Sequence, residues 1–238
     1  EQGIPGVADT HGEWVKFTNA AGDTIPAYVA WPERKDAAPT VIVIHQIYGL
    51  TPWETTVVDK LAGQGYVAIA PDLLGSMYGK SPASADSARK LFAGLTPERV
   101  MGDLDATAAW VDTLPGAQRG NMATIGFCWG GQQSFAYATH NPQLKAAVVC
   151  YGPAPDSAAM SRIQAPILGV YAENDARVSG PLPEVSATMK ALGKSFTYDI
   201  YPGTGHGFLT PGRMGNDTDQ PDKAWARIFE FYGKTLKN

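Results

Sequence analysis

The stretch that decides the fold is GFCWGG, residues 126–131, in which a single cysteine lies among glycines. The residues before it, MATIGF, are typical of a buried strand, and the residues after it, GGQQSFAYATH, favour a helix. A residue at such a corner has a strained backbone, and its neighbours must be small so that strand and helix can pack closely. Gly126 and Gly130 lie two residues on either side of Cys128, where this crowding is greatest. The pattern therefore predicts a sharp turn that presents the Cys128 thiol.

Strand and helix patterns alternate along the rest of the chain, which predicts a mostly parallel sheet with helices on both faces. About eight strands are expected, at residues 12–19, 25–32, 40–45, 67–72, 122–128, 146–152, 166–175 and 196–203. Helices are expected at residues 51–66, 85–94, 96–114, 130–140, 180–193 and 221–236. The first two strands should be antiparallel, and Thr51 followed by Pro52 is typical of a helix start. No internal repeat or linker appears, so we expect one domain over residues 1–238.

Composition narrows the classes of protein. The chain has 238 residues, of which 44% are hydrophobic and 18% charged, enough to build one full core. A net charge of -4 gives no indication of a nucleic-acid surface. No apolar run approaches about 18 residues, so we expect a soluble protein without a membrane span. We expect a monomer, either cytoplasmic or exported with its leader removed, since the sequence begins with Glu1.

Polar side chains follow several of the predicted strands at their carboxyl ends, where parallel sheets place their functional groups. His45 and Gln46 follow one strand, and Cys128, Asp175 and His206 follow three others. The last three supply a nucleophile, an acid and a base in that chain order. Cys128 also heads a helix whose dipole favours a thiolate. The next amide, that of Trp129, can donate to an oxyanion.

His206 is the best candidate base among the four histidines. It lies in the glycine-rich stretch GTGHGF, which is free to direct a side chain into a site. His11 lies in a polar N-terminal segment, and His140 ends a surface helix, where a histidine is an ordinary cap. His45 ends a buried strand and is expected to have its hydrogen bonds satisfied near the site.

Asp175 is the best candidate acid, because it follows its strand as Cys128 does. Asp199 lies within a strand and Asp156 in a proline-rich loop, which makes both weaker, and Glu173 is the fallback. The alternative for Asp175 is a helix or turn cap. The alternative for Cys128 is a small core residue, the role that we expect for Cys150. Neither cysteine lies in a spacing that suggests a disulfide framework or zinc, and no metal is expected.

The chain resembles the dienelactone hydrolases, a branch of the α/β-hydrolases with a cysteine nucleophile. The resemblance extends over nearly the whole chain, through TVIVIHQIYGL, GYVAIAPDLL, IGFCWGG, AENDARV and YPGTGHGF. It implies an α/β-hydrolase fold and hydrolysis of an enol-lactone ester through a thiol acyl-enzyme, as in a carboxymethylenebutenolidase. Cys128 would be the nucleophile, His206 the base and Asp175 the residue that orients it. No metal or organic cofactor is implied.

The resemblance also implies an oxyanion hole made by the backbone amides of Ile47 and Trp129. Tyr48 falls where the family has an aromatic residue. One departure is Gln46, where the family often has a glutamate that contacts the nucleophilic thiol.

The other departure concerns recognition of a substrate carboxylate. Two arginines serve it in the family, at positions that hold Thr210 and Ala85 here. Arg89, Lys80 and Arg213 are nearby in sequence and could substitute, although each also fits a solvated surface charge.

Three alternatives stay open at this point. One is a carboxylesterase of broad specificity, with an apolar pocket formed by Trp129, Tyr48, Phe127, Trp53 and Phe208. A second is a non-catalytic binding protein, against which the presence of both Asp175 and His206 argues. A third is a redox-sensing thiol, which the lack of a second cysteine nearby in sequence disfavours. The preferred prediction is a hydrolase whose partner is a small ester or lactone.

Overall fold

The computed structural model describes residues 9–237. Contacts between Cα atoms divide the chain into two compact units, Glu1–Met122 and Ala123–Asn238. The boundary falls within strand β5 (Ala117–Phe127), so the two units share one continuous strand. The expectation of a single domain over residues 1–238 stays a prediction.

The first unit contains four strands in the order β1-β2-β4-β3. They are β1 (Thr10–Thr18), β2 (Thr24–Pro32), β3 (Ala38–Ile44) and β4 (Val67–Pro71). β2 is antiparallel to both β1 and β4, whereas β3 and β4 are parallel. β3 and β4 are buried along their whole length, as their continuous apolar sequences predict.

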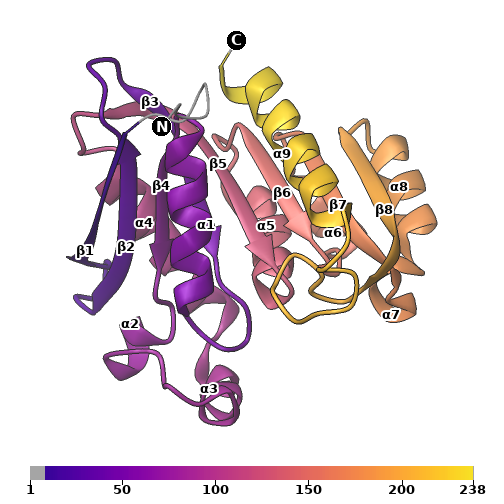
Figure 1. The fold of residues 1–238 in the computed structure, drawn as a ribbon, viewed down its shortest axis with the longest axis horizontal. Coiled ribbons are helices and arrows are strands. Elements are labelled where there is room, and N and C mark those ends of the chain that lie inside the picture. Colours follow the sequence, from indigo (N-terminus) through magenta and orange to yellow (C-terminus); the bar gives the residue numbers. More distant parts are fainter. Residues whose placement is uncertain (1–8, 238) are drawn as a thin grey trace. The chain divides into compact units, whose positions relative to one another are not determined.

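Helices lie on both sides of these strands. They are α1 (Pro52–Gly63), α2 (Gly75–Tyr78), α3 (Ala85–Leu91), a 3-10 turn η1 (Phe92–Gly94) and α4 (Pro97–Val111). Figure 1 shows α1 in front of the strands and α4 behind them. The helix start predicted at Thr51 is confirmed: its side chain accepts from Trp53 N–H, and Glu54 completes a capping box. The short helix α2 was not predicted, because its one turn lies in a glycine-rich stretch.

The second unit contains four parallel strands in the order β5-β6-β7-β8. After β5 come β6 (Ala146–Cys150), β7 (Ile167–Asn174) and β8 (Phe196–Gly205). The helices are α5 (Trp129–His140), α6 (Ser157–Met160), α7 (Ala176–Ser179), α8 (Leu182–Ala191) and α9 (Gln220–Leu236). In Figure 1, α9 lies in front of the strands and α5 and α8 lie behind. Parallel pairing brings the carboxyl ends of all four strands to one edge.

The C-terminal helix α9 covers this sheet with an apolar stripe. Its buried residues recur at helical spacing, with Trp225, Ile228 and Tyr232 among them. The hydroxyl of Tyr232 donates to the carbonyl of Thr124 at 2.7 Å, which ties the helix to the middle of β5. Burial of this stripe therefore fixes the strand that leads into Cys128.

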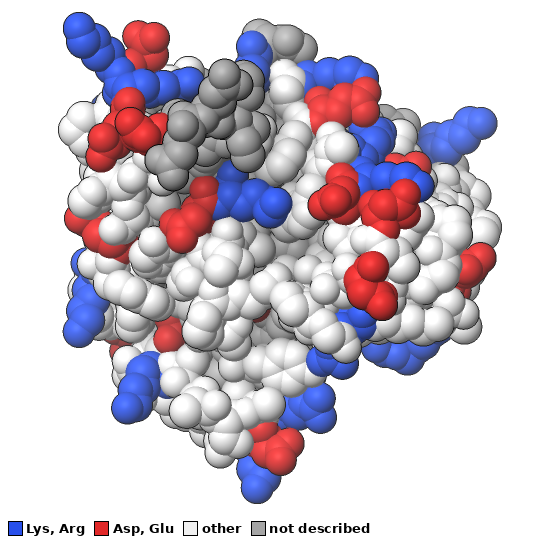
Figure 2. Space-filling model, in the orientation of Figure 1, with Lys and Arg blue, Asp and Glu red and all other residues white. Residues whose placement is uncertain are grey.

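The predicted fold class is confirmed: residues 9–237 contain eight strands, mostly parallel, with helices on both sides of the strands in each unit. Acidic and basic side chains are interspersed on the face shown in Figure 2. Among the helices of the described residues, none has the length and apolar content that crossing a membrane requires.

Candidate active site

Cys128 forms a sharp corner between β5 and α5, as the sequence predicts. Its φ of 59° and ψ of −116° are unusual for a residue with a side chain, and the residue is partly exposed. Its N–H donates to the carbonyl of Cys150 at 3.0 Å, which fixes the corner against the end of β6. Such strained positions cluster at functional sites, because the surrounding structure must maintain them.

Small residues around the corner let the backbones meet. A Cβ atom added to Gly126 would lie 1.8 Å from the carbonyl oxygen of Gly130. One added to Gly131 would lie 2.5 Å from the carbonyl oxygen of Cys150, and one added to Gly152 would lie 2.3 Å from the amide of Gln132. The need for glycine at position 126 is confirmed. The crowding also extends to Gly152 on the neighbouring strand end, which the sequence did not indicate.

The three predicted side chains meet at this edge of the second unit. The Nε2 of His206 lies 3.1 Å from the Sγ of Cys128, and the Nδ1 of His206 lies 2.5 Å from the Oδ2 of Asp175. Asp175 is an acceptor when ionised, so Nδ1 carries the hydrogen and Nε2 faces the thiol. The Asp175 side chain is 9% exposed and that of His206 34% exposed, so solvent reaches the imidazole while the carboxylate is shielded. The arrangement can pass a proton between the thiol and a bound molecule.

The environment raises the pKa of His206 above its ordinary value of 6.5. The hydrogen bond to Cys128 is the largest cause, and it outweighs the opposing effect of burial. The hydrogen bond to Asp175 and the charges of both partners raise the pKa further. His206 is therefore disposed to accept and hold a proton.

The competing acids are engaged elsewhere. Asp175 begins α7, but its side chain makes no capping bond, so the cap alternative fails. Glu173 accepts from the N–H of Gly203 at 2.8 Å, and Asp156 caps α6 through the N–H of Ala159. Asp199 pairs with Arg227. Of these four, Asp175 is the one bonded to His206.

The other histidines also have ordinary surroundings. His45 is fully buried, with Nδ1 2.8 Å from the carbonyl of Gln46 and Nε2 accepting from Leu73 N–H at 3.1 Å. The expectation that its hydrogen bonds are satisfied is confirmed. His140 is the last residue of α5, and His11 pairs with Glu13 on the exposed strand β1.

Tyr151 belongs to this edge and was not identified from the sequence. It is fully buried, has a φ of 41°, and its ring stands edge-on to that of His206 with centroids 5.2 Å apart. The ring of Phe208 also lies near that of Tyr151, with the ring centroids 6.0 Å apart. The available signal was position: Tyr151 directly follows β6, the strand beside the one that ends at Cys128. Cys150, one residue earlier, is fully buried as expected, and burial raises the pKa of its thiol.

In the first unit, the predicted near-site residues follow β3. Gln46 is buried, and its N–H donates to Glu54 at 3.5 Å. The hydroxyl of Tyr48 accepts from Arg89 at 3.3 Å, and the Arg89 guanidinium lies 5.4 Å from the centre of the Tyr48 ring. Arg89, which lies in α3, thus contacts the segment that includes Ile47. The roles of Ile47, Gln46 and Tyr48 in a site stay predictions.

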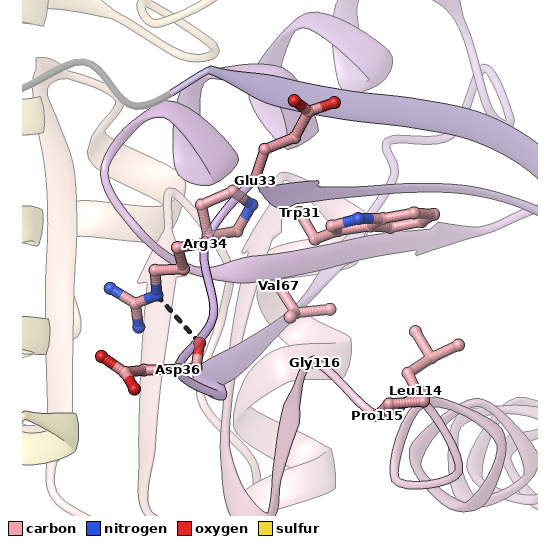
Figure 3. Close-up of a pocket in the computed structure, with 9 residues that line it drawn as sticks. Trp31, Glu33, Arg34, Asp36, Val67, Leu114, Pro115 and Gly116 are labelled. Carbon is pink, nitrogen blue, oxygen red and sulfur yellow. Dashed lines mark hydrogen bonds between the residues drawn. The ribbon is translucent and has the colours of Figure 1, made fainter.

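Each unit also contains a cavity. One cavity of the first unit, about 310 Å³, is lined by Trp31, Val67 and Leu114, and also by Glu33 and Asp36 (Figure 3). Because Val67 begins β4, this cavity lies at the edge of the strands opposite to Ile47 and Tyr48. The second unit contains a cavity of about 330 Å³, which Gly152 and Arg177 help to line. Within residues 9–237, no three or more His, Cys, Asp or Glu side chains are grouped so that they could hold a metal ion.

The mostly parallel sheet, the helices on both sides of its strands and the strained corner at Cys128 are those of an α/β-hydrolase fold. Solved structures agree: a "Putative Dienelactone Hydrolase" from Klebsiella pneumoniae superposes with a TM-score of 0.86 at 28% identity, over 94% of this chain and 99% of that one. The acylaminoacyl peptidase of Pyrococcus horikoshii, at 17% identity and a TM-score of 0.75, shares the fold over 96% of this chain and 42% of its own.

The particular family follows from sequence comparison. The model of the dienelactone hydrolase family matches residues 25–236, and the chain belongs to that family. A protein of Salmonella typhi named "Putative carboxymethylenebutenolidase" is 32% identical over 90% of this chain and 84% of its own length. A protein of Escherichia coli K12 with the same name is 32% identical over 89% of this chain and 83% of its own. The chain is therefore a dienelactone hydrolase-like hydrolase, as the resemblance implied.

Proposed function

We propose that the protein hydrolyses small esters or lactones through a thiol acyl-enzyme on Cys128. The observation that supports this most is the continuous line from Sγ of Cys128 to His206 at 3.1 Å and on to Asp175 at 2.5 Å. A thiol beside an oriented imidazole is an activated nucleophile, because the imidazole can take its proton.

In the acylation step, the Cys128 thiol transfers its proton to Nε2 of His206 and its sulfur attacks the ester carbonyl carbon. A C–S bond forms and the carbonyl oxygen becomes an oxyanion. The tetrahedral intermediate then collapses, the bond to the leaving oxygen breaks, and that oxygen takes the proton from Nε2. A lactone opens in this step, so its alcohol stays attached to the acyl group.

In the deacylation step, water attacks the thioester carbonyl. Nε2 of His206 removes a proton from the water, the new C–O bond forms, and the C–S bond breaks. The sulfur takes the proton back, and the carboxylic acid leaves. Asp175 accepts from Nδ1 throughout, which holds the imidazole in the tautomer that both steps need.

Trp129 is the first residue of α5 and directly follows Cys128. Its backbone N–H therefore lies at the usual place of one oxyanion donor. The family resemblance supplies Ile47 as the second donor. Both assignments are part of the proposal.

A substrate panel with trapping of the intermediate tests this function. Wild-type protein and Cys128→Ala are given a dienelactone, a neutral lactone and simple nitrophenyl esters, and the protein is quenched early in turnover for mass spectrometry. We expect an acyl adduct on the peptide that contains Cys128, absent from the variant. Comparable rates on all the nitrophenyl esters with no lactone turnover would favour the carboxylesterase alternative. Turnover by wild type without any adduct, under conditions where deacylation is slow, would argue against the thiol intermediate.

A further inference from the structure

The pairing between β7 and β8 changes register just before the candidate site. Ala172 pairs with Tyr201, and Asn174 pairs with Gly205, so two steps along β7 match four along β8. The extra residues of β8 form a bulge around Gly203, whose φ is 71°. The residues that follow the last pair are Asp175 and His206. Continuation of the earlier register would instead have placed Asp175 opposite Thr204.

Two side chains of β7 hold this bulge. The carboxylate of Glu173 accepts from the N–H of Gly203 at 2.8 Å. The side-chain amide of Asn174 donates to the carbonyl of Thr204 at 3.2 Å. Asp175 then accepts from His206 at 2.5 Å. The last two residues of β7 and the residue after it thus bind the bulge of β8 and the residue that follows β8.

We propose that Glu173 and Asn174 are positioning residues, which hold the β8 bulge in the register that places His206 on Asp175. This inference rests on the proposed function, in which His206 transfers the proton. Bulges near active sites serve to redirect a side chain, and the bulge leaves backbone groups without their regular ladder partners. Glu173 and Asn174 satisfy one N–H and one carbonyl of that segment. Both side chains are exposed, so their effect is on alignment more than on the stability of the core.

The test compares Asn174→Ala and Glu173→Ala with Glu173→Gln, whose amide oxygen can still accept from Gly203. Because small misplacements of a reacting group are costly, we expect kcat to fall about tenfold in each alanine variant, with KM changed less than about twofold. Glu173→Gln should keep most of the wild-type kcat. NMR titration of His206 should show a lower pKa in both alanine variants, because the bond to Asp175 weakens.

Asn141→Ala is the matched control. Asn141 also binds through its side chain, to Gln143 N–H and Tyr137, but it lies at the far end of α5 from Cys128. It should lower the unfolding temperature and leave kcat and the His206 titration unchanged. Alanine variants at 173 and 174 that behave like Asn141→Ala would overturn the proposal. The titration needs no turnover, so it tests the positioning role even if Cys128→Ala shows the proposed reaction to be wrong.

Discussion

Cys128 and Tyr151 are the residues other than glycine that take a positive φ within the described chain, at 59° and 41°. They directly follow the neighbouring strands β5 and β6. The Sγ of Cys128 lies within hydrogen-bond distance of His206, and the ring of Tyr151 stands edge-on to that of His206. The sequence predicted a sharp turn at Cys128, because glycines flank it on both sides. It also indicated Asp175 and His206 as the candidate acid and base, because each follows a strand. Tyr151 could not be identified, since a tyrosine after an apolar strand is common and its unusual backbone leaves no pattern in the sequence.

The titration of His206 is the first expected outcome at this scale. Because Cys128 and Asp175 both favour the imidazolium, His206 should keep its proton to a pH above 6.5. NMR of the histidine ring should show a midpoint above 6.5 in wild type. Cys128→Ala and Asp175→Asn should each lower it, and Cys128→Ala more, since that bond is the largest cause. A midpoint that neither variant moves would mean that the two contacts are absent in solution.

Substrate charge gives a second expected outcome. Thr210 and Ala85 stand where the family resemblance places arginines for a substrate carboxylate, and a hydrogen bond to a charged group contributes about 1.5–3 kcal/mol. We therefore expect kcat/KM for a carboxylated lactone and its neutral analogue to differ by less than about tenfold. A much stronger preference for the anion would show that another cation recognises it. Arg89→Ala, Lys80→Ala and Arg213→Ala would then identify which one.

At the scale of elements, the corner between β5 and α5 depends on close contact between backbones. The positions of β3 and β4 could be predicted from continuous apolar runs, and the starts of α1 and α4 from the threonine and proline at each start. The short helices α2, α6 and α7 could not, because a single turn has too few residues to show a period. The β8 bulge could not either, since pairing register depends on the neighbouring strand and not on β8 alone.

A pair of glycine substitutions tests the packing of the corner. Gly126→Ala would place a Cβ 1.8 Å from a backbone oxygen, so we expect destabilisation of several kcal/mol, on the order of the largest single substitutions, or failure to fold. Gly102→Ala, in the interior of α4, meets no atom within 4 Å and should stabilise the protein by about 0.4–1 kcal/mol. Urea unfolding of both variants measures the difference. Equal stabilities would show that the corner can open without cost.

At the scale of the whole molecule, the chain consists of two compact units that share β5. Composition predicted enough apolar residues for one domain, but no feature of the sequence indicated a boundary at residue 122, because it falls within a regular strand. The three residues of the proposed triad all lie in the second unit, whereas Ile47, Gln46 and Tyr48 lie in the first. The residue roles within the second unit therefore have contacts to support them, and those in the first remain inferences from the family.

Unfolding behaviour tests the expectation of a single domain. Since neither unit contains all of β5, we expect one cooperative transition in urea. Tryptophan fluorescence reports on both units, through Trp14, Trp31, Trp53 and Trp110 in the first and Trp129 and Trp225 in the second. Circular dichroism should follow the same curve. Two separated transitions would show that the units fold independently.

The most direct test of the central claim is the rate of ester hydrolysis by Cys128→Ala, measured beside wild type with a nitrophenyl ester that wild type turns over. If the Cys128 thiol is the nucleophile, kcat/KM should fall about a thousandfold or more, while circular dichroism shows an unchanged fold. A folded Cys128→Ala protein whose kcat/KM stays within about tenfold of wild type would contradict the proposed mechanism.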